Sequence, residues 1–258
     1  MTKKFFSTFA SALTLLLVGC VTTMDKPGKK IDKKRALEAN VKLGMAYLEQ
    51  NQRDDALRAF TNAIELDSIS AEAHQGMALI HQTNGEMDHA EVSFKRALKS
   101  RSDFSRSGIE FSYGRFLMMQ NRCEEALSFF EKVSKDFNYT NRAQALFNIG
   151  YCAEKLNDRV RATASYEYAL NVNKRFRAAA LELAHIKFED KDYVAAKKYL
   201  DTFSANSRQS ARSLWLGIRL ERVFGNQDKE ASYALALKNL HPYSQEYLEY
   251  KRILESTK

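Results

Sequence analysis

The chain has 258 residues with only two prolines and ten glycines, and 45% of its residues are hydrophobic. No proline stands between Pro27 and Pro242, which is hard to reconcile with an all-β fold and its many turns. The formal net charge of +8 would suit a nucleic-acid or anionic-surface partner. The composition therefore predicts an all-α protein and excludes collagen-like, low-complexity and disordered chains.

Residues 1–19 have the pattern of a secretory signal. Lys3 and Lys4 precede an apolar stretch that is too short to span a membrane and that ends in small residues. The sequence Leu-Val-Gly before Cys20 resembles the bacterial lipobox, whose cysteine becomes the lipidated first residue of the mature protein. We expect Cys20 to carry a diacylglyceryl group and an N-acyl chain such as palmitate; the alternative is an ordinary signal peptide with a coincidental cysteine. Loss of the two lysines lowers the net charge from +8 to +6.

Residues 20–36 are predicted to be the lipidated N-terminus and a flexible basic tether. Two or three acyl chains anchor a protein stably, whereas one does not. Val21 rather than aspartate follows the cysteine, and resemblance to Gram-negative sorting rules then implies the periplasmic face of the outer membrane. The cations of this segment suit an anionic surface, although a solvated linker without a partner is equally compatible. They are Lys26, Lys29, Lys30, Lys33, Lys34 and Arg35.

Residues 37–258 repeat one pattern with a period of about 34 residues, that of the tetratricopeptide (TPR) repeat. Each copy places a small residue on its first helix and, on its second, an aromatic or large apolar residue; two extra residues precede the third copy and two the fourth. The five clear pairs are Gly44 and Phe60, Ala78 and Phe94, Gly114 and Phe130, Gly150 and Tyr166, and Ala184 and Leu200. A sixth, degenerate copy begins near Ala211, and Ser244 is the expected N-cap of a terminal capping helix. We predict a right-handed α-solenoid of about six helical hairpins plus this C-terminal helix.

No pattern for catalysis or cofactor binding is found, so we predict a protein that is not an enzyme. The sequence has neither a glycine-rich phosphate loop nor an H-E-x-x-H motif. His74 and His81 lie two turns apart on one predicted helix, too far to share a zinc ion without a third ligand between them, and no metal site is predicted. Cys123 and Cys152 are expected at the same end of adjacent hairpins. They are a possible disulfide, with two separate buried thiols as the alternative.

The first helices of TPR solenoids line the concave face. At the groove-facing positions, the third to sixth copies supply residues that we call the concave stripe. They are Phe111, Arg115, Met118, Phe147, Tyr151, Leu181, His185, Phe188, Trp215 and Arg219. The stripe is the predicted groove for an amphipathic helix or an extended apolar segment, although single members could instead pack between helices. Val41 and Met45 stand where carboxylate-clamp TPR domains need lysine and asparagine, so capture of a C-terminal carboxylate is not predicted.

The chain as a whole resembles the type IV pilus biogenesis lipoproteins, the pilotin family called PilF or PilW. The segment Trp-Leu-Gly-Ile-Arg, residues 215–219, is the most discriminating match. The others are the lipobox followed by Val-Thr-Thr, the segment 40–48, Tyr113-Gly-Arg-Phe-Leu and Asn-Ile-Gly-Tyr-Cys152. There are departures from the family pattern: the family commonly has cysteine where this chain has Met118, and serine replaces proline at Ser68 and Ser102.

The resemblance implies a carrier for the secretin, the outer-membrane ring through which the pilus passes. Such a pilotin binds secretin subunits and promotes their outer-membrane localisation and multimerisation, with no nucleic-acid or small-molecule partner. Two alternatives remain from the sequence: a general periplasmic TPR adaptor for peptidoglycan enzymes or β-barrel assembly, and an enzyme of a type that the motifs do not reveal.

Overall fold

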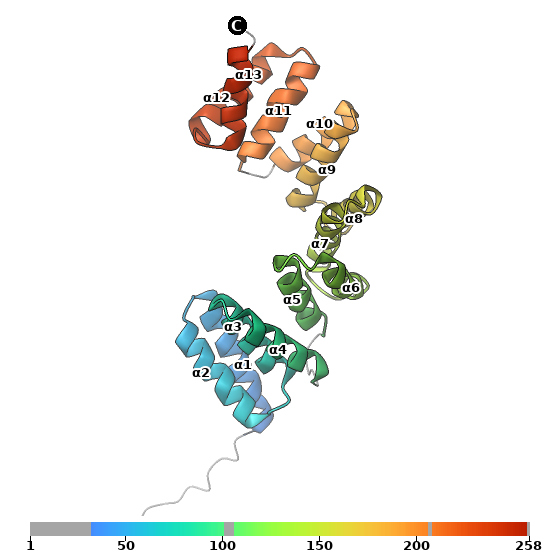
Figure 1. The fold of residues 1–258 in the computed structure, drawn as a ribbon. Helices are drawn as coiled ribbons and strands as arrows, with labels where there is room; N and C mark the ends of the chain where they lie inside the picture. The colour runs from blue at the N-terminus through green and yellow to red at the C-terminus, as the bar shows by residue number, and fades with distance from the viewer. Residues whose placement is uncertain (1–31, 101–105, 206–207, 257–258) are drawn as a thin grey trace, which may run out of the picture.

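The computed structural model describes residues 32–100, 106–205 and 208–256, which form thirteen α-helices and no strand. Helices α1 to α12 form six antiparallel hairpins, and α13 follows the last of them (Figure 1). The helices are α1 (Lys33–Glu49), α2 (Arg53–Leu66), α3 (Ala71–Thr83), α4 (Met87–Lys99), α5 (Arg106–Met119), α6 (Cys123–Ser134), α7 (Arg142–Lys155), α8 (Arg159–Val172), α9 (Arg177–Glu189), α10 (Tyr193–Ser204), α11 (Ala211–Val223), α12 (Gln227–Leu240) and α13 (Gln245–Ser256). The predicted TPR solenoid with its terminal helix is confirmed.

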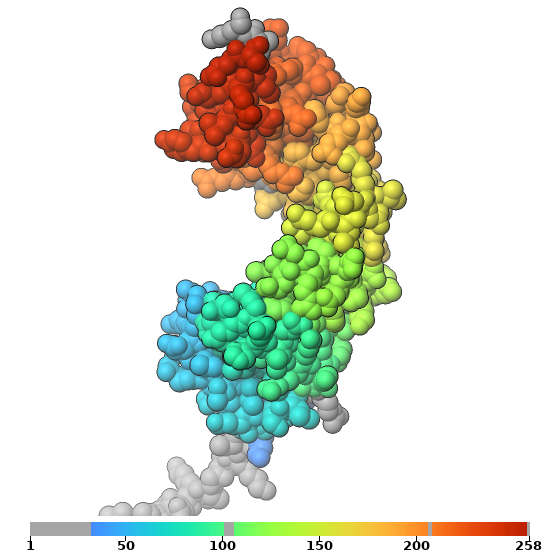
Figure 2. Space-filling view, in the orientation of Figure 1, coloured from blue at the N-terminus to red at the C-terminus, as the bar shows by residue number. Residues whose placement is uncertain are grey.

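The first helices of the six hairpins, α1 to α11 in odd numbers, form an inner layer of the solenoid. α3 contacts α5, α5 contacts α7, and α9 contacts α11, in addition to the contacts of each helix with its hairpin partner. Figure 2 shows the molecule hollowed on one side, between the blue N-terminal helices and the red C-terminal helices. The curvature follows from a small rotation repeated at each hairpin.

Each hairpin turns at a residue in the left-handed region of φ. These residues are Asn51, Gly85, Asn121, Asn157, Lys191 and Gly225, with φ between 59° and 81°. Glycine and asparagine tolerate this conformation better than other residues do. The turn positions recur at 34 residues, as from 51 to 85, or at 36, as from 85 to 121. The longer intervals fall where the sequence predicted two extra residues.

Close packing of a ring against glycine joins helices within and between repeats. The ring of Phe60 on α2 is fully buried between α1 and α3. A Cβ atom at Gly44 would come within 2.7 Å of this ring, and one at Gly76 within 2.2 Å. The same relation holds between Gly114 and the buried ring of Phe130, at 2.9 Å. Because these separations leave no room for a methyl group, the glycines set how closely the helices approach.

Ion pairs also join neighbouring repeats. Arg122, in the turn before α6, donates to both carboxylate oxygens of Glu91 on α4, at 2.7 and 3.1 Å, and the Tyr113 hydroxyl donates to the same carboxylate at 3.1 Å. The pKa of Glu91 is lowered to about 2, mainly because of the hydrogen bond from Arg122. On the C-terminal side, Arg212 on α11 makes two 2.9 Å bonds to Glu182 on α9. Two-bond arginine–carboxylate pairs fix geometry as well as charge.

The ends of the solenoid differ partly from the sequence prediction. The first helix begins at Lys33, inside the segment predicted as tether, because the Asp32 side chain accepts a hydrogen bond from the Arg35 amide and caps it. The tether prediction is therefore wrong for residues 33–36. The predicted cap of α13 is confirmed, since Ser244 accepts from the Tyr247 amide at 3.2 Å. The signal peptide, the lipidation of Cys20 and the rest of the tether lie outside the described residues, and no helix within them is long and apolar enough to cross a bilayer.

Replacing Phe130 by alanine should lower the free energy of unfolding by about 3–5 kcal/mol, because its fully buried ring fills the gap beside Gly114. The matched control is Phe137→Ala, since the Phe137 side chain is 78% exposed and its loss should change the free energy by less than about 0.5 kcal/mol. Urea unfolding followed by circular dichroism measures both. Equal losses in the two variants would contradict this packing of Phe130 against Gly114.

Candidate interaction surface on the concave face

The structure places the whole concave stripe on the inner helices α5, α7, α9 and α11. Its ten members differ in exposure. Arg115 and Tyr151 are exposed; Met118, Phe147, His185, Phe188 and Arg219 are half-buried; Phe111, Leu181 and Trp215 are buried. Seven of the predicted residues therefore offer surface to a partner, and three belong to the core.

The burial of Trp215 corrects the prediction that it lines the groove. The indole is only 7% exposed and packs in a cluster with α13, where the ring of Tyr250 meets it edge-on at 6.2 Å. Phe111 and Leu181 are 7% and 8% exposed and belong to the continuous core. The sequence could not show this, because a groove position becomes a core position wherever the next helix covers it.

Arginine side chains cover the aromatic rings at two places on the concave stripe. The guanidinium carbon of Arg219 lies 4.2 Å from the centroid of the Phe188 ring and 6.0 Å from that of Trp215. Arg115 lies 6.0 Å from the centroid of Phe111. These are cation–π contacts, which hold a charged group over an apolar face. The resulting surface is amphipathic rather than purely apolar.

Phe147 lies at the middle of the concave stripe and is held by one ring of its own hairpin and one ring of the next hairpin. Its centroid is 5.3 Å from that of Tyr166 on α8 and 5.5 Å from that of Phe176, just before α9. A half-buried ring in this setting keeps one face for a partner at little cost in conformational entropy. Sequence analysis missed Lys155, which lies 5.5 Å from the Tyr151 centroid. Its spacing of four residues from Tyr151 on one helix was the available signal.

Two buried polar atoms on α7 and α9 have no hydrogen-bond partner among the described residues: Nδ2 of Asn148 and Nε2 of His185. Burial is the main cause that lowers the pKa of His185 to about 4, and the nearby Arg212 guanidinium lowers it further. The imidazole is therefore neutral at pH 7. A buried polar atom without a partner lowers the stability of the fold by about 1–3 kcal/mol, and this applies to both Asn148 and His185.

Cys123 and Cys152 are brought together as the sequence predicted. Cys123 begins α6, Cys152 lies on α7, and both are buried free thiols. Burial, together with a hydrogen bond to Cys123, raises the pKa of the Cys152 thiol. Their adjacency satisfies the first requirement for a bridge, and the disulfide stays a prediction.

Comparison with known proteins defines the family. The tetratricopeptide-repeat model matches residues 41–105. The type IV pilus assembly protein PilF of Pseudomonas aeruginosa is 37% identical over 241 residues, which make up 93% of this chain and 95% of that protein. The chain belongs to the PilF family.

Solved structures agree with this membership. A structure from the functional characterization of Pseudomonas aeruginosa PilF matches with a TM-score of 0.80 and 35% identity, covering 85% of this chain and 98% of that one. PilW, described as a widely conserved type IV pilus biogenesis factor, matches with a TM-score of 0.70 and 26% identity, covering 84% and 98%. This PilF-family chain is thus a TPR protein of type IV pilus biogenesis, a class that acts through protein–protein contacts.

One side-chain group of this PilF-family chain was missed by the sequence analysis. His74 and His81, the pair that spacing along the sequence suggested, both lie on α3. The structure instead brings His81 close to Glu86 and His89, across the turn into α4. The three residues are five and then three positions apart. Only the antiparallel hairpin makes this spacing converge.

The stability of the protein should fall on mild acidification because of His185. The unfolded chain takes up a proton near the ordinary pKa of 6.5, whereas the folded chain does so only near 4. Above about pH 6.5 the free energy of unfolding is therefore at its full value. It falls by up to about 3 kcal/mol as the pH drops from 6.5 through 4. His185→Phe should remove this part of the decline. Urea unfolding at pH 7 and pH 4.5 measures it, and equal declines in the two proteins would contradict the assignment.

Proposed function

We propose that this chain is an outer-membrane lipoprotein that acts as a pilotin for type IV pilus assembly. In this proposal the concave stripe binds a hydrophobic segment of the secretin subunit. The lipid on Cys20 carries the complex to the periplasmic face of the outer membrane, where the secretin multimerises. The observation that carries the proposal is the set of half-buried aromatic and arginine side chains on the inner helices of a PilF-family chain.

The chemistry of the concave stripe supports an amphipathic partner segment. Phe147 offers a half-buried ring, and Arg219 lies against Phe188 with its charge over the ring, so that apolar and charged groups adjoin. Aromatic and arginine side chains dominate the binding energy of protein interfaces. An apolar side chain of the partner can pack on the rings while its polar groups meet the guanidinium groups, as when an amphipathic helix binds in a groove.

The aromatic side chains of the concave stripe are held in place by neighbouring rings. Phe147 packs against Tyr166 of its own hairpin and Phe176 of the next, and Phe188 packs against Tyr193 with the ring centroids 5.3 Å apart. The side chains are therefore ordered before a partner arrives, so little conformational entropy is lost on binding. A carrier of this kind needs an anchor and a groove, and no catalytic group.

Replacing Phe147 and Phe188 by alanine should abolish secretin multimers in the outer membrane. Each truncation of a central aromatic residue costs about 2 kcal/mol, or roughly 30-fold in affinity. The matched control is the pair Val160→Ala and Val194→Ala. These side chains are 83% and 74% exposed on the outer helices α8 and α10. Multimers are counted by electrophoresis of unheated outer membranes.

Arg219→Glu separates loss of binding from loss of folding, because Arg219 is half-buried at the surface and its replacement removes no core side chain. It should reduce secretin multimers while the circular dichroism spectrum stays that of the parent. Normal multimers in both this variant and the double aromatic variant would sink the groove assignment. Recovery of peptidoglycan enzymes or β-barrel assembly proteins, in place of secretin, would favour the adaptor function instead.

Cys20→Ala tests the anchor separately. Without acyl chains the mature chain should move from the membrane to the soluble periplasmic fraction. Secretin multimers should then disappear from the outer membrane although the groove is intact. Immunoblots of fractionated cells measure both proteins. Unchanged outer-membrane multimers in this strain would rule out the carrier mechanism.

A further inference from the structure

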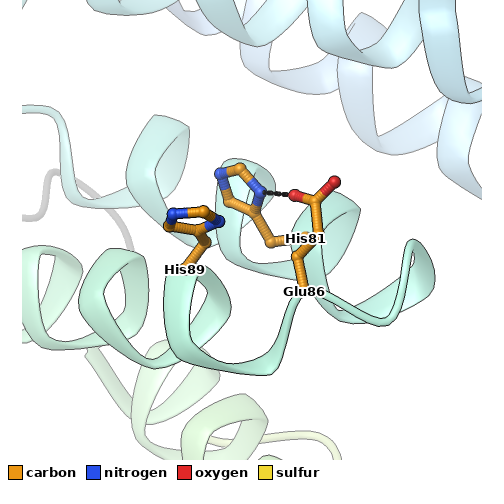
Figure 3. Close-up of side chains that lie close together, drawn as sticks. All are labelled: His81, Glu86 and His89. Carbon is orange, nitrogen blue, oxygen red and sulfur yellow. Dashed lines mark hydrogen bonds and ion pairs between the residues drawn. The ribbon is translucent and has the colours of Figure 1, made fainter.

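Three potential metal ligands converge at the turn between α3 and α4 (Figure 3). His81 lies near the end of α3, Glu86 directly precedes α4, and His89 lies in the first turn of α4. His81 Nδ1 is 2.5 Å from Glu86 Oε2, and the two imidazole centroids are 5.4 Å apart. One ring nitrogen of each histidine and one oxygen of the carboxylate all lie within 4.8 Å of one another.

The backbone of the turn fixes this convergence. Gly85 has φ of 81°, a conformation that suits glycine. The amide of Glu86 then donates to the carbonyl of His81 at 2.8 Å, and the amide of Asn84 to that of Ile80 at 3.0 Å. Backbone hydrogen bonds alone therefore hold the end of α3 close to the start of α4. The donor atoms therefore start within 4.8 Å of one another.

Glu86 occupies a position that caps the second helix in other repeats, but it does not cap. At the corresponding positions, Asp158, Asp192 and Asn226 each accept a hydrogen bond from the amide three residues on. The Glu86 side chain makes no such bond and reaches back to His81 instead. The Glu86 side chain therefore does not cap α4 and lies beside the imidazoles of His81 and His89 instead.

The neighbours of this group leave it accessible, although the Asn84 side chain also donates a hydrogen bond to the Glu86 carboxylate. Within the described parts of the chain, the Glu86 carboxylate forms an ion pair with His81. Two other histidines are engaged elsewhere: a ring nitrogen of His74 bonds to the Ser68 carbonyl, and one of His241 to the Gln209 carbonyl. Both Glu86 and His89 are exposed, so an ion can reach them from solvent.

We propose that His81, Glu86 and His89 form a binding site for Zn²⁺. Two imidazoles and one carboxylate are a ligand set that zinc prefers, with the fourth tetrahedral position left for water. Bonds of about 2 Å place tetrahedral ligand atoms about 3.3 Å apart, so donors up to 4.8 Å apart must close and the 2.5 Å pair of His81 and Glu86 must open. A bound ion would join the end of α3 to the start of α4 and stiffen the second hairpin. The site does not depend on secretin binding.

Titration calorimetry of the mature chain, purified in detergent without a polyhistidine tag, tests the site with Zn²⁺. We expect one ion per chain. His89→Gln and Glu86→Gln should each weaken binding at least as much as loss of an outer-shell partner does, about 10-fold to 100-fold. His74→Gln is the matched control, on the same helix as His81 but outside the group. It should bind as the parent does.

Visible spectroscopy with Co²⁺ identifies the ligands independently of affinity. Tetrahedral coordination by nitrogen and oxygen should give the intense bands of four-coordinate Co²⁺ without a thiolate charge-transfer band, and His89→Gln should lose the tetrahedral bands. A thiolate band would show that Cys123 or Cys152 binds the ion and would overturn the proposal. Failure of Zn²⁺ to bind, or equal binding by the parent and His89→Gln, would also overturn it.

Discussion

Close contact between a large side chain on each second helix and a small residue on the first helices is the constraint on which the molecule depends. Phe60 is enclosed by Gly44 of its own hairpin and Gly76 of the next, both too close to admit a Cβ atom. The contact therefore sets two distances at once, one within a repeat and one between repeats. Because each repeat touches only its neighbours, these local distances sum to the curvature of the solenoid.

Because the solenoid is curved, some aromatic residues of the inner helices are buried and others are partly exposed. Where the next helix covers a ring, as α13 covers Trp215, the ring contributes to the core. Where the hollow begins, a ring such as Phe188 is covered on one side by its own hairpin and on the other by the Arg219 guanidinium. An arginine over a ring places a charged group and the apolar part of its own side chain side by side on the surface. The resulting surface suits a partner that is itself amphipathic.

The turns between the two helices of each hairpin share one backbone geometry but carry different side-chain interactions. The turn needs one residue with positive φ and leaves the next residue to cap the second helix. Asp158 and Asp192 cap in the ordinary way, Arg122 instead pairs with Glu91 of the preceding repeat, and Glu86 turns to His81. A repeat fold thus fixes the backbone at each turn and leaves the side chain free to serve a separate purpose.

The sequence by itself determined the solenoid, the number of hairpins, the positions of the turns and the terminal cap at Ser244. These depend on spacing along the chain: a small residue, a ring and a turn residue recur at intervals that only stacked helical hairpins satisfy. The sequence also placed the concave stripe on the inner helices and Cys123 near Cys152. The tertiary structure alone decided which groove positions are surface, because burial of Trp215 depends on where α13 packs. It also decided that His81, Glu86 and His89 converge, since donors on two helices meet only when the hairpin closes.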